Sequence, residues 1–167
     1  MLKGIEIKTL TRHFDERGSF TELIRKDWKK LLNNDEFVQT NLSISYPGIV
    51  RAWHRHLKGQ IDYFLCLLGS IKLCAFDDGK RELTEIIVSG EELRIIRIPG
   101  HYWHGFKVIG PRPSWLVYFV NKLYNPLNPD EERRPWNDQT IIPLSINSKV
   151  NDQRVNKPWN WFNTVHK

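Results

Sequence analysis

The sequence predicts a mainly β fold in one domain, either a barrel or a sandwich. Short apolar runs follow one another along the chain, and turn residues such as Gly69-Ser70 and Asp77-Asp78-Gly79 separate them. This regular spacing is typical of barrels and sandwiches. The length of 167 residues suffices for one buried core and is too short for two ordinary domains, so we expect residues 1–167 to form a single domain. The predicted strands are 39–45, 61–68, 71–76, 93–98, 101–109 and 115–120, with another between residues 79 and 89.

The two ends of the chain are patterned differently from this β region. Between residues 21 and 33, apolar side chains recur at intervals of three and four, which predicts the one short helix of the chain. From Tyr124 onward prolines are frequent, so we expect an extended C-terminal arm that lies over the barrel. The apolar residues of the predicted helix are Leu23, Ile24, Trp28, Leu31 and Leu32.

The composition is that of a soluble globular protein, with 40% hydrophobic and 26% charged residues. The longest apolar runs fall far below the roughly 20 residues that span a bilayer, and Lys3, Glu6 and Lys8 interrupt any leader. We therefore expect a cytoplasmic protein with no membrane partner. Cys66 and Cys74 lie in apolar strands, where we expect small buried hydrophobes and no disulfide framework.

The formal net charge of +6 suits an anionic partner. Most of the positive residues are nevertheless dispersed, apart from two short clusters near residues 25–30 and 133–134. A nucleic-acid-binding protein more often carries a dense basic stripe interleaved with exposed aromatic residues. We expect the charge to be mainly solvated surface, and we expect no nucleic-acid partner.

The predicted strand 39–45 alternates in an unusual way. One face carries only amide and hydroxyl side chains, whereas the other carries Thr40, Leu42 and Ile44. Such a polar face is either the solvent side of an ordinary strand or, inside a small barrel, the lining of a ligand cavity. The residues of the polar face are Gln39, Asn41, Ser43 and Ser45.

Four of the six histidines fall in two clusters, His54-Arg55-His56 and His101-Tyr-Trp-His104. His54 and His56 are two residues apart, so both project from the same face of a strand. A single buried histidine is more often a hydrogen-bonded structural residue than a catalyst. Two clusters on barrel strands favour a functional site.

Several motifs occur in one order between residues 14 and about 140. They are FDERGSFTE at 14–22, QTNLSIS at 39–45, GIVRAWH at 48–54, HGF at 104–106, the pair Tyr118 and Tyr124, and WND at 136–138. Together they resemble the dTDP-4-dehydrorhamnose 3,5-epimerase family. The resemblance implies a cupin jelly-roll β-barrel that epimerises C3 and/or C5 of a nucleotide-linked 4-keto-6-deoxyhexose.

The resemblance assigns the catalytic roles to His54 and Tyr118. A ketone at C4 acidifies the C–H bonds at C3 and C5, so a base on one face of the sugar can remove a proton and an acid can return one to the opposite face. By the resemblance His54 is the base and Tyr118 is the proton donor. A histidine near pKa 6.5 suits the first role, because its neutral form dominates at pH 7.

The resemblance also implies the substrate contacts and the assembly. The family requires no metal or organic cofactor, and its N-terminal segment reaches into the site of a neighbouring subunit, which implies a homodimer. The partner implied is a nucleotide sugar. By the resemblance, Arg17 and Arg51 contact the diphosphate and nucleotide, Tyr124 stacks on the base, and the other substrate-binding residues are Glu22, Gln39, Asn41 and His104.

Two features of the sequence do not fit directly with what the resemblance implies. Arg51 and His54 are three apart and would face opposite sides of a regular strand, so a shared cavity requires a β-bulge or a strand end between them.

Asp62 stands where the family normally has a lysine that stabilises the enolate. We expect Asp62 to hydrogen-bond to His54 and to act in catalysis, in the way that carboxylates orient catalytic histidines elsewhere. The alternative is that Asp62 pairs with Arg51 or Lys58.

Two alternative functions stay open on the sequence. The spacing of His54, His56 and Asp62 resembles the metal-binding motif of other cupins, and His104 would complete a set of three histidines and one carboxylate. This spacing favours a metal-dependent cupin enzyme, although His56 is also readily explained as a surface residue. The second alternative is a barrel that binds nucleotide sugars without turning them over.

Overall fold

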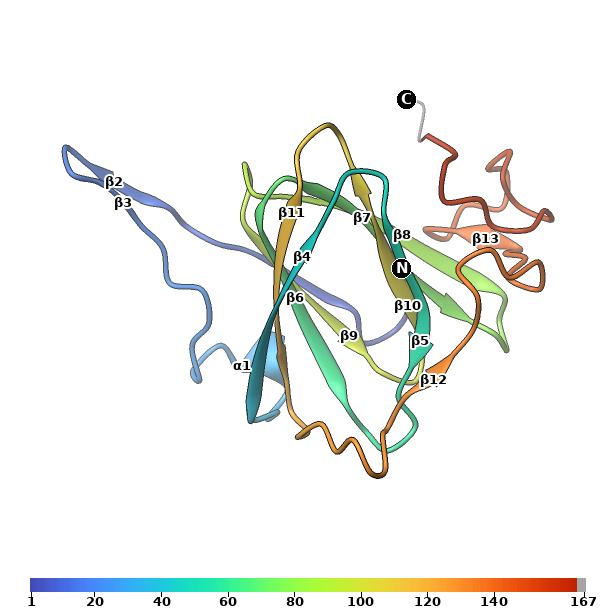
Figure 1. The fold of residues 1–167 in the computed structure, drawn as a ribbon, viewed down its shortest axis with the longest axis horizontal. Helices are drawn as coiled ribbons and strands as arrows, with labels where there is room; N and C mark the ends of the chain where they lie inside the picture. Colours follow the sequence, from blue (N-terminus) through green and yellow to red (C-terminus); the bar gives the residue numbers. More distant parts are fainter. Residues whose placement is uncertain (165–167) are drawn as a thin grey trace.

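The computed structural model describes residues 1–164, whose two larger β-sheets pack face to face (Figure 1). All neighbouring strands within the two sheets pair antiparallel except β13 and β8. The five-stranded sheet has the order β1 (Glu6–Thr9), β9 (Arg94–Pro99), β6 (Ile61–Leu68), β11 (Ser114–Val120) and β4 (Gln39–Ser45). The six-stranded sheet has the order β12 (Glu132–Arg133), β5 (Val50–Arg55), β10 (Trp103–Ile109), β7 (Ser70–Asp77), β8 (Glu82–Ser89) and β13 (Ser145–Ile146).

Alternation along the strands divides the apolar residues among three clusters. The inner faces of the sheets meet in the main core, which includes Phe64, Leu73 and Leu116. The outer face of the five-stranded sheet buries Tyr63 and Leu65 under residues from the N-terminal segment. Because both faces of each central strand are covered, β6 and β7 read as nearly continuous apolar runs and not as simple alternation. All the strands expected between residues 39 and 120 are confirmed.

The helix expected over residues 21–33 is wrong in extent. Helix α1 covers only Lys29–Leu32, although Leu23, Ile24 and Trp28 do pack against the outer face of the five-stranded sheet. The position before the helix is Trp28, which supplies no capping hydrogen bond, and the short helix carries lysines and no acidic residue. The apolar residues of this segment are therefore buried by a mostly irregular chain that lies along the sheet, and not by one long helix.

The C-terminal arm is confirmed as a covering layer. Ile141, Trp159 and Trp161 pack with Trp53 and Trp103 against the outer face of the six-stranded sheet. A charged network lies under the same arm: buried Glu85 forms an ion pair with Lys72 at 3.3 Å and accepts a hydrogen bond from Arg154 at 2.9 Å. The arm thus holds the sheet that carries the histidine clusters. Cys66 and Cys74 are free and buried, as expected.

A hairpin projects away from the body of the molecule. It consists of β2 (His13–Asp15) and β3 (Gly18–Phe20), which pair only with each other (Figure 1). Phe14 is 74% exposed and Phe20 is 66% exposed, so the hairpin presents two large apolar side chains to its surroundings. Within residues 1–164, we find no helix whose length and apolar character would allow it to cross a membrane.

Candidate active site

A cavity of about 540 Å³ opens between the two sheets. Gln39, Asn41 and Ser43 of β4 line it, whereas Leu42 and Ile44 point outward and are exposed. The unusual polar face of this strand is therefore a cavity wall and not a solvent face. Most of the lining is polar or charged, and Phe64, Phe106 and Leu116 add an apolar surface of rings and methyl groups.

A β-bulge brings Arg51 and His54 to the same cavity. In the pairing of β5 with β10, His54 lies opposite His104 and Arg51 lies opposite Phe106, so three residue steps on β5 match two on β10. The extra residue reverses the alternation between these positions, and both side chains line the cavity. The irregularity that the sequence required is confirmed.

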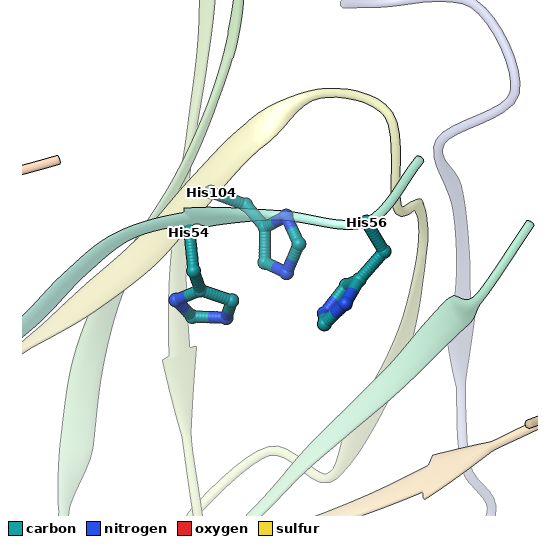
Figure 2. Close-up of side chains that lie close together, drawn as sticks. All are labelled: His54, His56 and His104. Carbon is teal, nitrogen blue, oxygen red and sulfur yellow. The ribbon is translucent and has the colours of Figure 1, made fainter. Parts of the chain in front are cut away.

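Three histidines converge beside this bulge. His54 and His56 project from the same side of the β5 segment and His104 reaches the same space from β10, as Figure 2 shows. One ring nitrogen from each residue can be chosen so that all three lie within 4.8 Å of one another. The rings of His54 and His104 are in contact, with centroids 4.2 Å apart.

Asp62 contacts His104 and His56, and not His54 as we expected. Its Oδ2 lies 3.1 Å from Nε2 of His104 and 3.5 Å from Nε2 of His56. Asp62 lies on β6, in the sheet opposite both His54 and His104, and across the floor of the barrel its side chain meets the fully buried His104. Burial acts to raise the pKa of Asp62, but contact with His104 and the charges of the histidines outweigh it, so the pKa lies below its usual value.

The surroundings of His54 favour its neutral form. Burial is the largest cause and the nearby His104 is the second, and together they hold the pKa of His54 well below 6.5, against the opposing charge of Asp62. A histidine with a lowered pKa carries a free lone pair at neutral pH. His54 is therefore available as a base, which is what proton abstraction requires.

Tyr118 faces the cavity from the opposite sheet. It lies on β11, whereas His54 lies on β5, so the two side chains line the cavity from different sheets. Burial and the charge of Asp62 raise the pKa of Tyr118 above 10, which keeps its hydroxyl protonated at neutral pH. A base on one wall and a protonated phenol on the other can act on two faces of one ligand.

Hydrogen bonds hold two of the predicted substrate contacts. Nε of Arg51 donates to Oγ of buried Ser45 at 2.8 Å, which leaves the two terminal nitrogens of the guanidinium for a ligand. Oε1 of Gln39 accepts from the backbone N–H of Tyr124 at 2.9 Å, and its Nε2 donates to Oδ1 of Asn41 at 2.8 Å. Gln39 thereby ties the start of the C-terminal arm to the polar wall and keeps Tyr124 at the cavity mouth.

The structure does not bring every predicted residue to the cavity of its own chain. Arg17 lies on the projecting hairpin, where its side chain is 85% exposed and pairs with Asp15. Glu22 follows the hairpin and pairs with Arg25. His104 is fully buried behind the cavity wall, so its role as a direct substrate contact stays a prediction.

Sequence reasoning missed several groups at the site. Gln60 lies at the cavity floor between His56 and Asp62, and its position two residues before Asp62 in the sequence was the available signal. The backbone carbonyl of Asp130 accepts a hydrogen bond from Nδ1 of His56, a contact that no side-chain pattern could reveal. Arg133 lies opposite His54 in the β12–β5 pairing and lines the cavity.

Comparison with known proteins identifies the family. Residues 13–132 match the family described as the polysaccharide biosynthesis C-terminal domain. A Haloferax volcanii protein named "Probable low-salt glycan biosynthesis epimerase Agl13" is 41% identical over 140 residues, covering 81% of this chain and 88% of that protein. The dTDP-4-dehydrorhamnose 3,5-epimerase of Shigella flexneri is 30% identical over 156 residues, covering 84% of each chain.

The solved structures agree. The dTDP-6-deoxy-D-glucose-3,5-epimerase of Legionella pneumophila, in complex with dTDP-4-keto-L-rhamnose, aligns with a TM-score of 0.73 at 26% identity, over 89% of this chain and 86% of that one. The alignment confirms the predicted cupin jelly roll. The chain therefore belongs to the polysaccharide biosynthesis C-terminal domain family and to the dTDP-4-dehydrorhamnose 3,5-epimerase family of nucleotide-sugar epimerases.

Proposed function

We propose that this protein inverts C3 and/or C5 of a nucleotide-linked 4-keto-6-deoxyhexose. The observation that carries the proposal is the placement of His54 and Tyr118 on opposite sheets around one cavity. The Legionella relative holds a dTDP-linked 4-keto sugar, which supports a nucleotide sugar as the ligand.

In this mechanism the neutral ring of His54 takes a proton from the carbon beside the ketone, and the C–H electrons move into an enolate. The hydroxyl of Tyr118 then gives its proton to the opposite face of the same carbon. The step leaves His54 protonated and Tyr118 ionised, and exchange of one proton through solvent restores both. Each positioned transfer contributes typically about 10²–10⁴-fold to the rate.

Stabilisation of the enolate must come from groups other than the usual lysine, because Asp62 occupies that place. Four cationic side chains line the cavity: Arg51, Lys122, Arg133 and Arg134. In the proposed binding mode Arg51 grips the diphosphate with the terminal nitrogens that Ser45 leaves free. The positive potential of the four side chains then acts both on the diphosphate and on the charge that develops at the ketone oxygen.

The test is product analysis with purified protein and a dTDP-linked 4-keto-6-deoxyglucose. We expect proton NMR to show a product with inverted configuration at C3, C5 or both. A ligand that binds tightly and returns unchanged would show instead that the protein is a barrel that binds nucleotide sugars without converting them. The same spectrum shows whether C3, C5 or both carbons are inverted.

A metal-dependent cupin enzyme is the second candidate, and specific contacts favour it. Nδ1 of His104 contacts the carbonyl of Tyr102 at 2.8 Å, and Nδ1 of His56 contacts the carbonyl of Asp130, so both rings turn Nε2 inward. Nε2 of His104 and Oδ2 of Asp62 are buried without a hydrogen bond of good geometry. The three histidines fit a divalent ion, and Asp62 lies beside two of them as a fourth candidate ligand.

Such an ion would act as a Lewis acid that polarises the ketone. Elemental analysis of protein purified without chelators, followed by activity after EDTA dialysis, separates the two candidates. The metal-free epimerase predicts substoichiometric metal and unchanged turnover. Stoichiometric metal together with loss of turnover on EDTA treatment would favour the metal-dependent enzyme.

We also propose that two copies of the chain form a homodimer in which each hairpin β2–β3 completes the site of the other copy. The support is that Arg17 and Glu22, both predicted ligand contacts, lie outside the cavity of their own chain. Phe14 and Phe20 are exposed on the same hairpin and would be buried by such an exchange. A cytoplasmic location stays a prediction.

A further inference from the structure

Gln60 joins two groups of the cavity floor. Its side-chain Nε2 lies 3.0 Å from Nε2 of His56 and 2.9 Å from Oδ1 of Asp62. The backbone of Gln60 is itself fixed, because its carbonyl accepts from the N–H of Gly100 at 3.1 Å. An added Cβ on Gly100 would lie 2.2 Å from that carbonyl oxygen, so the close approach depends on the glycine. The backbone contact with Gly100 therefore fixes the position from which the side-chain amide of Gln60 extends.

The hydrogen-bond directions around Gln60 follow from its partners. A carboxylate oxygen can only accept, so the amide must turn its NH₂ group and not its oxygen toward Asp62. The second hydrogen of the same NH₂ group then points at Nε2 of His56, which must offer a lone pair. The hydrogen of the neutral His56 ring therefore lies on Nδ1, where the carbonyl of Asp130 accepts it.

The hydrogen bond from Gln60 occupies the lone pair on Nε2 of His56, which a metal ion would need. A histidine that donates from Nδ1 to a carbonyl binds metal through Nε2. In this structure the Gln60 amide already occupies Nε2 of His56, and it also occupies one of the two oxygens of Asp62. A metal held by the full set of three histidines and Asp62 would have to displace the amide from His56.

We propose that Gln60 is a positioning residue that keeps His56 hydrogen-bonded in the cavity floor and out of the coordination sphere of a divalent ion. The inference rests on the proposed metal-free epimerase, in which the histidines act as bare side chains. Its consequence is that removal of the amide frees two acceptors, Nε2 of His56 and Oδ1 of Asp62, for a metal. On this proposal, Gln60 determines whether these residues act in a metal-free epimerase or bind a metal ion.

The experiment compares Zn²⁺ binding to the full-length wild type and to the variants Gln60→Leu and Gln139→Leu after removal of metal with EDTA. Gln139 is an exposed glutamine whose amide donates to a backbone carbonyl on the C-terminal arm, so it is the matched control. We expect Gln60→Leu to bind Zn²⁺ about tenfold tighter than the wild type or the control, because two hydrogen bonds no longer compete with the metal. Equal affinities in all three proteins would overturn the proposal.

A second measurement needs no variant. Long-range proton–nitrogen NMR of the wild-type histidine rings should show His56 neutral with its hydrogen on Nδ1, and one equivalent of Zn²⁺ should leave these signals unchanged. A shift of the His56 Nε2 signal on addition of Zn²⁺ would contradict the proposed role. Neither readout depends on turnover, so a wild type that keeps the His56 signals but converts no substrate would refute the epimerase and leave the role of Gln60 intact.

Discussion

Gly105 sets the spacing between the two strands that carry the histidines, so Gly105→Ala should damage both stability and activity. A Cβ at position 105 would lie 2.3 Å from Cβ of Ala52 and 2.6 Å from the carbonyl oxygen of Arg51. Ordinary carbon–carbon contacts lie near 3.5–4.0 Å. Strand β5 must therefore retreat by more than about 1 Å at the bulge that brings Arg51 and His54 to one cavity.

The magnitude follows from this clash. Overpacking of a well-packed interior costs about 1–3 kcal/mol, and a misplacement of about 1 Å at a catalytic group can lower the rate about 10²-fold. Urea denaturation and the rate of product formation measure the two effects. The control is Gly79→Ala, where the added Cβ would meet only a side-chain oxygen of Asp77 at 3.4 Å in an exposed turn. If Gly105→Ala kept the stability and turnover of the wild type, the account of how the bulge positions the site would be wrong.

Three further predictions concern the reaction itself. Tyr118→Phe should still exchange the carbon-bound proton with solvent through His54 but should lower inversion about 10²–10⁴-fold, as measured by NMR of the product; equal losses of exchange and inversion would argue against separate roles. The charge of Asp62 raises the pKa of His54, so Asp62→Asn should lower that pKa further and move the acidic limb of the pH–rate profile to lower pH; a shift to higher pH would refute the assignment. If each hairpin completes the site of its partner, mixing inactive Arg17→Ala with inactive His54→Asn should restore about a quarter of the wild-type activity. About half of the dimers are then mixed, and each mixed dimer contains one intact site out of two. No recovery after subunit exchange would contradict the shared site.

Local alternation predicted the parts of this site that depend on one strand. The period of two placed Gln39, Asn41 and Ser43 on one face of residues 39–45, but the sequence left open whether that face meets solvent or a cavity. The distance of three residues between Arg51 and His54 required a bulge, and the register of β5 with β10 contains it. The first inference needed only the geometry of a single strand, and the second also needed the family resemblance that assigns Arg51 and His54 to one cavity.

Contacts between sheets could not be predicted in this way. Asp62 was expected beside His54, but pairing across the barrel floor places it against His104 instead. The helix expected over residues 21–33 is shorter because burial against the outer face of the sheet, and not helical propensity, holds Leu23 and Trp28. The amide of Gln60 reaches Asp62 two residues along the chain, but its contact with His56 forms only when the two sheets come together.

The most direct test of the central claim is transfer of solvent deuterium to the sugar by the wild type and by His54→Asn. The claim is that His54 removes the proton beside the ketone, and this step can be observed without any net change of product. We expect the wild type in D₂O to place deuterium at C3, C5 or both of a dTDP-linked 4-keto-6-deoxyglucose, as read by mass spectrometry and NMR. His54→Asn should bind the same ligand and incorporate deuterium no faster than the solution without protein. Exchange at the wild-type rate in His54→Asn would show that another group is the base, and absence of exchange in the wild type would show that the cavity binds its ligand without reacting.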